Sequence, residues 1–239
     1  MPIKKFDWST LTRLEIYDYL QLLHSKLVDK RLSADKHYKL LANHIRKLAP
    51  IRVTKRVNYY VGRNQVIISG QYNSEWDEEN KKAITICLLY CPFDKRITMP
   101  ESNFIYTCKN IADTILHELI HMRQYRRRNF EYRSDYKSKE EQIEKRREQS
   151  YLGNKDEIDA FGFNIACELY DRFGNRRRDI EKYLDCARPK KHCLYKYYLN
   201  TFNNDHTHPV ICELKKKVKN YLPLAEMGKP YKNNDWIWY

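Results

Sequence analysis

The sequence has no long apolar run and no recognisable targeting segment. No stretch approaches the ~18 consecutive apolar residues that a membrane-spanning helix requires, so no membrane contact is expected. The opening residues, Met-Pro-Ile-Lys-Lys-Phe-Asp-Trp, lack the apolar stretch of a signal peptide, so signal-directed secretion is not expected. Internal repeats, long linkers and low-complexity segments are also missing. The 239 residues are enough to bury a sizeable core, and one domain is the natural expectation.

The cysteines do not suggest a disulfide framework. There are seven, an odd number, and several lie among apolar residues. This pattern favours reduced thiols and a cytosolic location. A second metal site can be drawn, but its spacing matches no standard zinc module. Its candidate ligands are Cys186, His192, Cys193, His206 and His208. The two last histidines are better explained as the approach to a helix that begins at Pro209.

Acidic residues are fewer than basic ones. The chain has 45 Lys and Arg against 31 Asp and Glu, for a formal net charge of +14. Such an excess attracts polyanions, anionic surfaces or acidic partners without specifying which, and general solubility is the simpler explanation. A nucleic-acid or other polyanion contact therefore stays open as a partner hypothesis. The basic clusters fall at 126–128, 145–147, 176–178, 190–191 and 215–217.

One stretch indicates a chemistry. His117-Glu118-Leu119-Ile120-His121 is an HExxH pentapeptide, which on a helix places two imidazoles one turn apart. Both can then bind one zinc ion, and Glu118 can take a proton from a water on the metal. The alternative is that His117 and His121 are ordinary core histidines of an amphipathic helix. A glutamate between them argues against this, because a buried carboxylate requires a partner.

The residues around the pentapeptide predict a helix over 107–129. Apolar residues recur at spacings of mostly three and four, and neither Pro nor Gly interrupts the run. Asp113 is expected early in this helix, where negative charge is favourable. Arginines 126–128 are expected near its C-terminal end.

A third protein ligand is expected about 36 residues after the second histidine. The segment 151–169 begins with turn residues and continues with helical periodicity, and Asn154 or Asp156 can cap it. Glu157 falls in the first turn, where its carboxylate can project towards the HExxH helix. Ala160, three residues later, is small enough to let two helices approach closely.

This combination resembles the gluzincin arrangement of zinc metallopeptidases, and the small minigluzincins are nearest in size. An HExxH helix followed by a Glu-x-x-Ala helix carries the likeness, which covers roughly residues 65–173. The segment 156–166 also resembles one found in zincin-like proteins encoded by bacteriophages, which would make the protein virion-associated if it is phage-encoded. The resemblance implies a His117–His121–Glu157 zinc site with Glu118 as the general base.

The chain departs from the family at one position. Many gluzincins carry an aspartate four residues after the ligand glutamate, and here Phe161 occupies that place. Asp159 is the candidate to orient a ligating histidine instead, or to be the third ligand itself. A first turn that is acidic simply because of the helix dipole explains Glu157 and Asp159 without any metal. The group that would stabilise the oxyanion is not placed, and Tyr132, Tyr136, Tyr151 and the downstream histidines are candidates.

The fold expected is α+β and zincin-like, with a small mixed sheet. Short β-rich runs at 66–70 and 83–90 are expected strands, with further ones at 52–57 and 96–99, and the stretch 73–80 is expected to be a turn or loop. By the resemblance, the 83–90 strand would bind extended substrate at an exposed sheet edge. The core is expected at about 50–175, with N-terminal helices at 8–48 and a helical extension at 176–239. Helices within that extension are expected at 177–184, 191–202 and 209–222.

The sequence therefore predicts a zinc-dependent metallopeptidase acting on a protein or peptide substrate. One alternative is a basic nucleic-acid-associated or virion protein that keeps an inactive zincin scaffold. Another is a zinc enzyme that cuts one specific partner and shows no general peptidase activity. The aromatic end of the chain, 235–239, is expected to pack on the protein's own surface.

Overall fold

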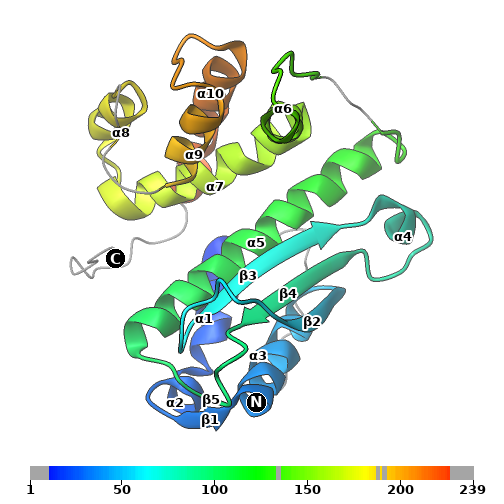
Figure 1. Ribbon diagram of the computed structural model, residues 1–239, viewed down its shortest axis with the longest axis vertical. Coiled ribbons are helices and arrows are strands. Elements are labelled where there is room, and N and C mark those ends of the chain that lie inside the picture. The colour runs from blue at the N-terminus through cyan, green and yellow to red at the C-terminus, as the bar shows by residue number, and fades with distance from the viewer. Residues whose placement is uncertain (1–10, 133–135, 187–188, 190–192, 227–239) are drawn as a thin grey trace. The chain divides into compact units, whose positions relative to one another are not determined.

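A computed structural model describes residues 11–132, 136–186, 189 and 193–226 (Figure 1). The chain divides into two compact units, 1–131 and 132–239. The expected α+β class is confirmed, since the described residues form ten helices and two small sheets. The boundary between the units falls inside the range 50–175 that the sequence suggested for the core. The aromatic end, 235–239, lies outside the described residues.

The first unit combines a three-stranded sheet, a two-stranded ribbon and five helices. The ribbon pairs β1 with β5 antiparallel, and the larger sheet has the order β2-β4-β3. Its elements are α1 (Arg13–Gln21), α2 (His24–Leu27), β1 (Arg31–Ser33), α3 (Ala34–Leu48), β2 (Ile51–Val57), β3 (Val66–Tyr72), α4 (Ser74–Glu78), β4 (Ile84–Tyr90), β5 (Arg96–Thr98) and α5 (Glu101–Arg127).

The 83–90 strand is not a sheet edge, so that part of the expectation is wrong. β4 lies between β2, its parallel neighbour, and β3, its antiparallel neighbour. Five of its seven residues are buried, and a nearly continuous apolar run is typical of a strand paired on both sides. The strand that ends the sheet beside the HExxH helix is β3.

One face of the sheet carries both long helices of the unit. Val53, Ile86 and Gly70 align across the three strands, and so point to the same side. On this side α3 packs on β2, and α5 packs on β3 and β4 (Figure 1). The opposite face carries exposed side chains of β2 and β3, among them Arg52, Arg56, Ile67, Ser69 and Gln71.

The α5 helix begins earlier than the sequence suggested. It starts at Glu101, directly after Pro100, so Asp113 lies in its middle rather than near its start. A helix-dipole role for Asp113 is therefore wrong. Its carboxylate instead accepts two hydrogen bonds from the guanidinium of Arg13 on α1, one of them with Nη2 to Oδ2 at 3.0 Å. This ion pair joins α1 to α5 at Asp113, one helical turn before His117.

The stretch 73–80 contains a short helix rather than only a loop. Asn73 caps α4 by accepting from the backbone N–H of Trp76 at 2.8 Å. Asp77 on this helix is buried, and its carboxylate accepts from the Arg126 guanidinium at 2.6 and 2.8 Å. The Tyr72 hydroxyl donates to the same carboxylate at 3.0 Å. This cluster fixes α4 to the C-terminal end of α5.

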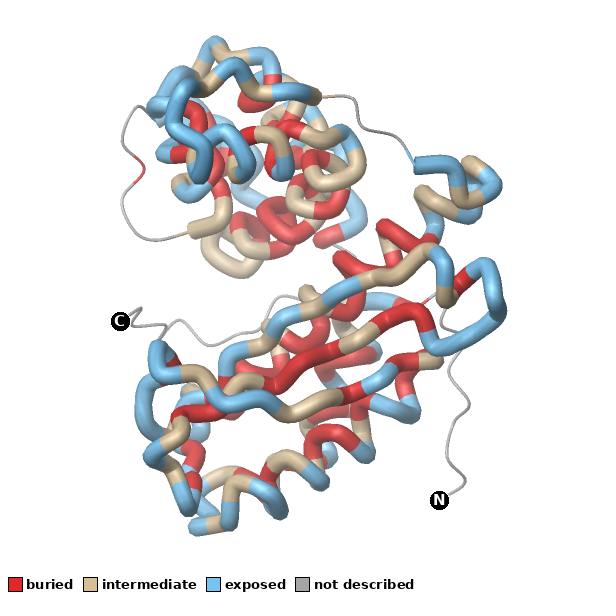
Figure 2. The backbone as a smooth tube through the Cα atoms, turned by 45° about the vertical axis from the view of Figure 1, so that its right-hand side comes forward, coloured by how far each residue is buried: buried red, intermediate tan, exposed pale blue. Residues whose placement is uncertain are grey.

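The second unit is helical in its described residues. It contains α6 (Ile143–Leu152), α7 (Lys155–Phe173), α8 (Arg177–Leu184), α9 (Leu194–Thr201) and α10 (Pro209–Glu226). The expected helices at 177–184 and 209–222 are confirmed, with Pro209 opening the last. The helix expected at 191–202 corresponds to α9, which begins at Leu194, and residues 191–192 lie outside the described residues. The core is rich in aromatic side chains, with Tyr195, Tyr198 and Phe202 fully buried. Buried segments run along the inner sides of these helices (Figure 2).

Among the described residues, none of the helices combines the length and apolarity needed to cross a membrane. All seven cysteines are free thiols, and Cys87, Cys91, Cys108 and Cys167 are buried.

Candidate metal centre

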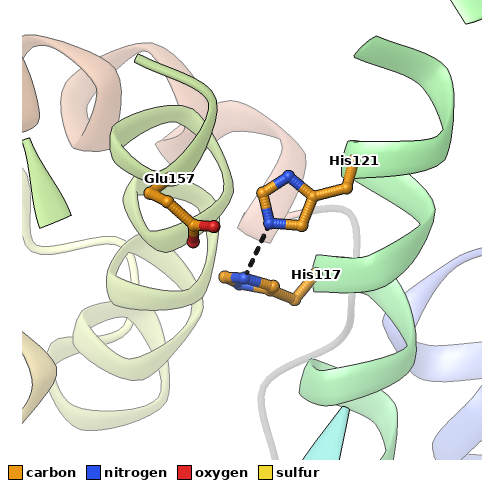
Figure 3. A group of neighbouring side chains, drawn as sticks. All are labelled: His117, His121 and Glu157. Carbon is orange, nitrogen blue, oxygen red and sulfur yellow. Dashed lines mark hydrogen bonds between the residues drawn. The ribbon is translucent and has the colours of Figure 1, made fainter. Parts of the chain in front are cut away.

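The two histidines of the HExxH motif face each other on α5. Both side chains are buried, and their Nε2 atoms lie 3.1 Å apart, joined by the hydrogen bond drawn in Figure 3. The i, i+4 spacing on an uninterrupted helix produces this arrangement, since positions four apart lie one above the other. The helical placement of both histidines is therefore as the sequence predicted.

The separation of the two nitrogens fits a shared metal ion. Zinc binds imidazole nitrogen at about 2.0–2.1 Å, so two ligands at a tetrahedral angle lie about 3.3 Å apart. The 3.1 Å between the Nε2 atoms of His117 and His121 is close to that span. The hydrogen bond between them requires one proton, and a metal ion bound by both nitrogens would take the place of that proton.

Gln124 was missed by the sequence reasoning and holds the second histidine. Its Oε1 lies 3.0 Å from Nδ1 of His121. In the tautomer that keeps Nε2 free of a proton, Nδ1–H donates to this amide oxygen, which orients the ring for metal binding. The signal was present in the sequence, because a residue three positions after the second histidine shares its helix face.

Glu118 lies against β3 at a glycine. A Cβ atom at Gly70 would come within 2.4 Å of Oε1 of Glu118 and 2.6 Å of Cγ2 of Thr114. Only a residue without a side chain fits at this point of the strand. Glu118 is itself buried, so its carboxylate is confined between α5 and the β3 backbone. Gly70 had no functional signal in the sequence, because it becomes relevant only when β3 packs on α5.

The carboxylate of Glu157 belongs to the first turn of α7. The helix begins at Lys155 after Asn154, whose side chain accepts from the Asp156 backbone N–H at 2.9 Å. Asn154 is thus the cap, one of the two alternatives that the sequence left open. The next helical turn contains Ala160, which is fully buried.

The three residues that the sequence names as metal ligands, His117, His121 and Glu157, are drawn in Figure 3. The histidines belong to the first unit and the glutamate to the second. A three-ligand site therefore requires that α5 and α7 come together, and it stays a prediction.

Asp159 is not a member of that group. Its Oδ1 accepts from Nζ of Lys217 on α10 at 2.7 Å, an ion pair within the second unit. Gly162, one turn later, packs against the same lysine, where a Cβ would meet Lys217 Cβ at 2.7 Å. These contacts give Asp159 a role in joining α7 to α10. A contact between Asp159 and a ligating histidine stays a prediction.

The second metal site drawn from the sequence is not formed by the described residues. The side chain of Cys193 caps α9 by accepting from the Lys196 N–H, and it contacts the Tyr183 hydroxyl at 2.8 Å. The Cys212 thiol interacts with backbone carbonyls. His192 lies outside the described residues.

Comparison of the chain with protein-family models, with curated proteins and with solved structures finds no match.

Proposed function

We propose that the protein is a zinc-dependent metallopeptidase with a zincin-like fold. In this proposal His117, His121 and Glu157 bind zinc, and Glu118 is the general base. The observation that carries the proposal is the 3.1 Å approach of two buried Nε2 atoms beside a buried glutamate on the same helix. That donor set leaves a fourth tetrahedral position for water, as catalytic zinc sites do.

The chain's residues divide the chemistry among them. Zinc, when bound, polarises the scissile carbonyl and lowers the pKa of a coordinated water towards ~7. Glu118 accepts the proton of the attacking water and later delivers it to the leaving amine. Gln124 keeps the His121 ring in the tautomer that offers Nε2. Gly70 leaves room for the Glu118 carboxylate beneath β3.

β3 is the strand suited to bind an extended peptide. The resemblance to zincins implies substrate pairing with a sheet edge near the HExxH helix, and here β3 has that position. A peptide added to its free edge would pair with backbone groups and tolerate varied side chains. It would also run past Gly70 and thus beside Glu118.

The first experiment is metal content by mass spectrometry on the full-length protein and its variants. Wild type and Glu118→Gln should each contain about one zinc per chain, whereas His117→Ala and Glu157→Gln should lose most of it. Asp156→Asn is the matched control, because it makes the same carboxylate-to-amide change one position away and should retain zinc. Loss of zinc in Asp159→Asn but not in Glu157→Gln would make Asp159 the third ligand.

Activity is then tested with the zinc-loaded protein on casein and on a peptide library from a cell digest. Hydrolysis by wild type and none by Glu118→Gln, with equal zinc content, is the expected result. A wild-type protein that takes up no zinc would overturn the proposal. Zinc bound at His117 but hydrolysis unchanged in Glu118→Gln would overturn the assigned base. Cleavage restricted to one partner protein would explain inactivity on casein.

A further inference from the structure

We propose that an aromatic–basic surface on the first unit binds single-stranded nucleic acid. This surface comprises the rings of Tyr59, Tyr60 and Phe93 and the cations of Arg56, Arg63, Lys95 and Arg96. They come from two segments, the β2–β3 loop with the end of β2, and the β4–β5 loop with the start of β5. The inference is independent of the metal centre and of peptidase activity.

The three rings are exposed to solvent. Tyr60 is 94% exposed, Tyr59 76% and Phe93 65%. The neighbouring Val57 is exposed as well, so the apolar surface extends beyond the rings. Single exposed aromatics are common, but several gathered on neighbouring loops are typical of a binding site.

The loops that carry these rings are tied together. The Tyr59 and Phe93 rings meet edge-to-face with centroids 5.9 Å apart. The Asn64 backbone N–H donates to Oδ2 of Asp94 at 2.6 Å, which joins the two loops a second time. The Asn58 side chain accepts from the Tyr60 backbone N–H at 2.8 Å and shapes the turn that presents both tyrosines. The rings are therefore preorganised, which lowers the entropy cost of binding a ligand.

The charge beside the rings is positive. Arg56, Arg63, Lys95 and Arg96 are all exposed, and none of them forms an ion pair with a carboxylate in the described parts of the chain. The acidic residue among them, Asp94, is occupied by the hydrogen bond from Asn64. Arg56 also extends the surface onto the open face of the sheet, where Arg52 is exposed too.

Exposed rings interleaved with cations match single-stranded nucleic acid better than other anions. Unpaired bases stack on aromatic side chains, while arginine and lysine neutralise the phosphates between them. In a duplex the faces of the bases are stacked on one another, so a duplex would contact only the arginine and lysine side chains of this surface. An acidic peptide would likewise leave the three rings without a role.

The test is fluorescence anisotropy with a labelled 15-nucleotide oligo(dT) and the full-length protein, in EDTA so that metal binding does not contribute. Tyr59→Ala/Tyr60→Ala should weaken binding about tenfold or more. Tyr60→Trp should preserve it, because a larger ring still stacks. Arg63→Gln/Lys95→Gln should make the slope of log K against log[salt] less negative by about 1.4, since each phosphate contact contributes about 0.7.

Matched controls lie in the same unit. Tyr106→Ala removes another exposed tyrosine, from α5, and Lys26→Gln/Lys47→Gln removes two exposed charges elsewhere; both should leave the affinity within about twofold. Equal loss in Lys26→Gln/Lys47→Gln would show binding by net charge alone, and equal loss in Tyr106→Ala would show that the loop tyrosines have no special role; either result would overturn the proposal. So would a duplex of equal length binding as tightly as oligo(dT). Binding to anionic vesicles that depends on Tyr59 and Tyr60, without oligo(dT) binding, would assign the surface to a membrane instead.

Discussion

The two units of the chain differ in what they bury. The first encloses ionic and polar groups, including the Asp77–Arg126–Tyr72 cluster and the hydrogen bond between His37 and Tyr90 at 3.0 Å. The core of the second is a continuous apolar cluster of aliphatic side chains and several aromatic rings, with Tyr198 stacked on Phe202 at 6.4 Å between centroids. The first unit carries the two histidines and the glutamate of HExxH, whereas the second contributes one candidate ligand.

This difference follows from what each unit has to hold in place. Polar groups in a low-dielectric interior need defined partners, so a network of them allows few alternative arrangements. Under the proposed function, that property would suit a unit whose helix presents two imidazoles and a carboxylate in fixed orientations. Apolar packing stabilises in proportion to the buried area and is not directional. The comparison makes predictions for each unit, from the largest effect to the smallest.

The largest effect is expected when the buried carboxylate of Asp77 loses its cation. Arg126→Leu should lower the free energy of unfolding by about 3–5 kcal/mol, because an uncompensated charge stays buried. Asp77→Leu should cost less, about 1–3 kcal/mol, since the Arg126 side chain is 43% exposed and water can hydrate it. Urea denaturation followed by circular dichroism measures both.

A double variant tests whether the buried charge of Asp77 causes this loss of stability. Arg126→Leu/Asp77→Leu should be more stable than Arg126→Leu alone, because no buried charge then remains. Additive losses would show that the pair acts only through packing.

The second effect is a pH dependence that comes from His37. Burial lowers the pKa of His37 to about 4, whereas an unfolded histidine titrates near 6.5. Between these values the unfolded chain binds the extra proton, so stability is fully present above pH ~6.5 and is lost as the pH falls towards ~4. The loss from this residue should reach about 2 kcal/mol between pH 7 and pH 5.

Urea titrations at both pH values compare wild type with His37→Gln, which keeps a hydrogen-bonding side chain beside Tyr90. The variant should lose about 2 kcal/mol less than wild type on acidification. His24→Gln, at a half-exposed histidine of the same unit, should follow wild type. Identical acid sensitivity in wild type and His37→Gln would contradict the assignment.

The third prediction concerns Gly70, the glycine beside Glu118, which is the proposed general base. Gly70→Ala should destabilise the first unit by about 1–3 kcal/mol, because the new methyl group overlaps Thr114 and Glu118. If the proposed function holds, it should also lower kcat at least tenfold, while zinc content stays near one per chain. Stability is measured by urea denaturation, and kcat with whichever substrate the library yields.

Thr114→Ala in the same background separates the two consequences. It removes one of the overlapping groups, so stability should partly recover, but the displaced Glu118 should keep activity low. Full recovery of activity would show that Gly70 matters only for packing.

The smallest effect concerns two buried tyrosines of the second unit. Replacing each of them with Phe should change the stability of the protein in opposite directions. The Tyr198 hydroxyl has no hydrogen-bond partner within the described residues, whereas the Tyr195 hydroxyl donates to the carbonyl of Leu184. Tyr198→Phe should therefore stabilise the protein by about 1 kcal/mol, and Tyr195→Phe should destabilise it by about 1 kcal/mol. Thermal unfolding of both variants beside wild type decides the signs.

Elements with a strong local pattern were predictable, and those created by long-range contacts were not. The helix at 177–184 and the strands near 66–72 and 84–90 match their apolar periodicity. The β1 strand was missed, because Arg31-Leu32-Ser33 is extended through its pairing with β5. The central position of β4 in the sheet could likewise not be predicted from the pattern of each strand alone, since strand order depends on pairing with strands far along the chain.

The candidate site divides in the same way. The facing pair His117 and His121, and Gln124 beneath the second ring, lie within two turns of one helix, so helical spacing in the sequence alone determines them. By contrast, Gly70 lies against Glu118, 48 positions later, and Asp77 accepts hydrogen bonds from Arg126, 49 positions later. Only tertiary packing decides such contacts, because they exist once β3, α4 and α5 are placed side by side and no local periodicity encodes that placement.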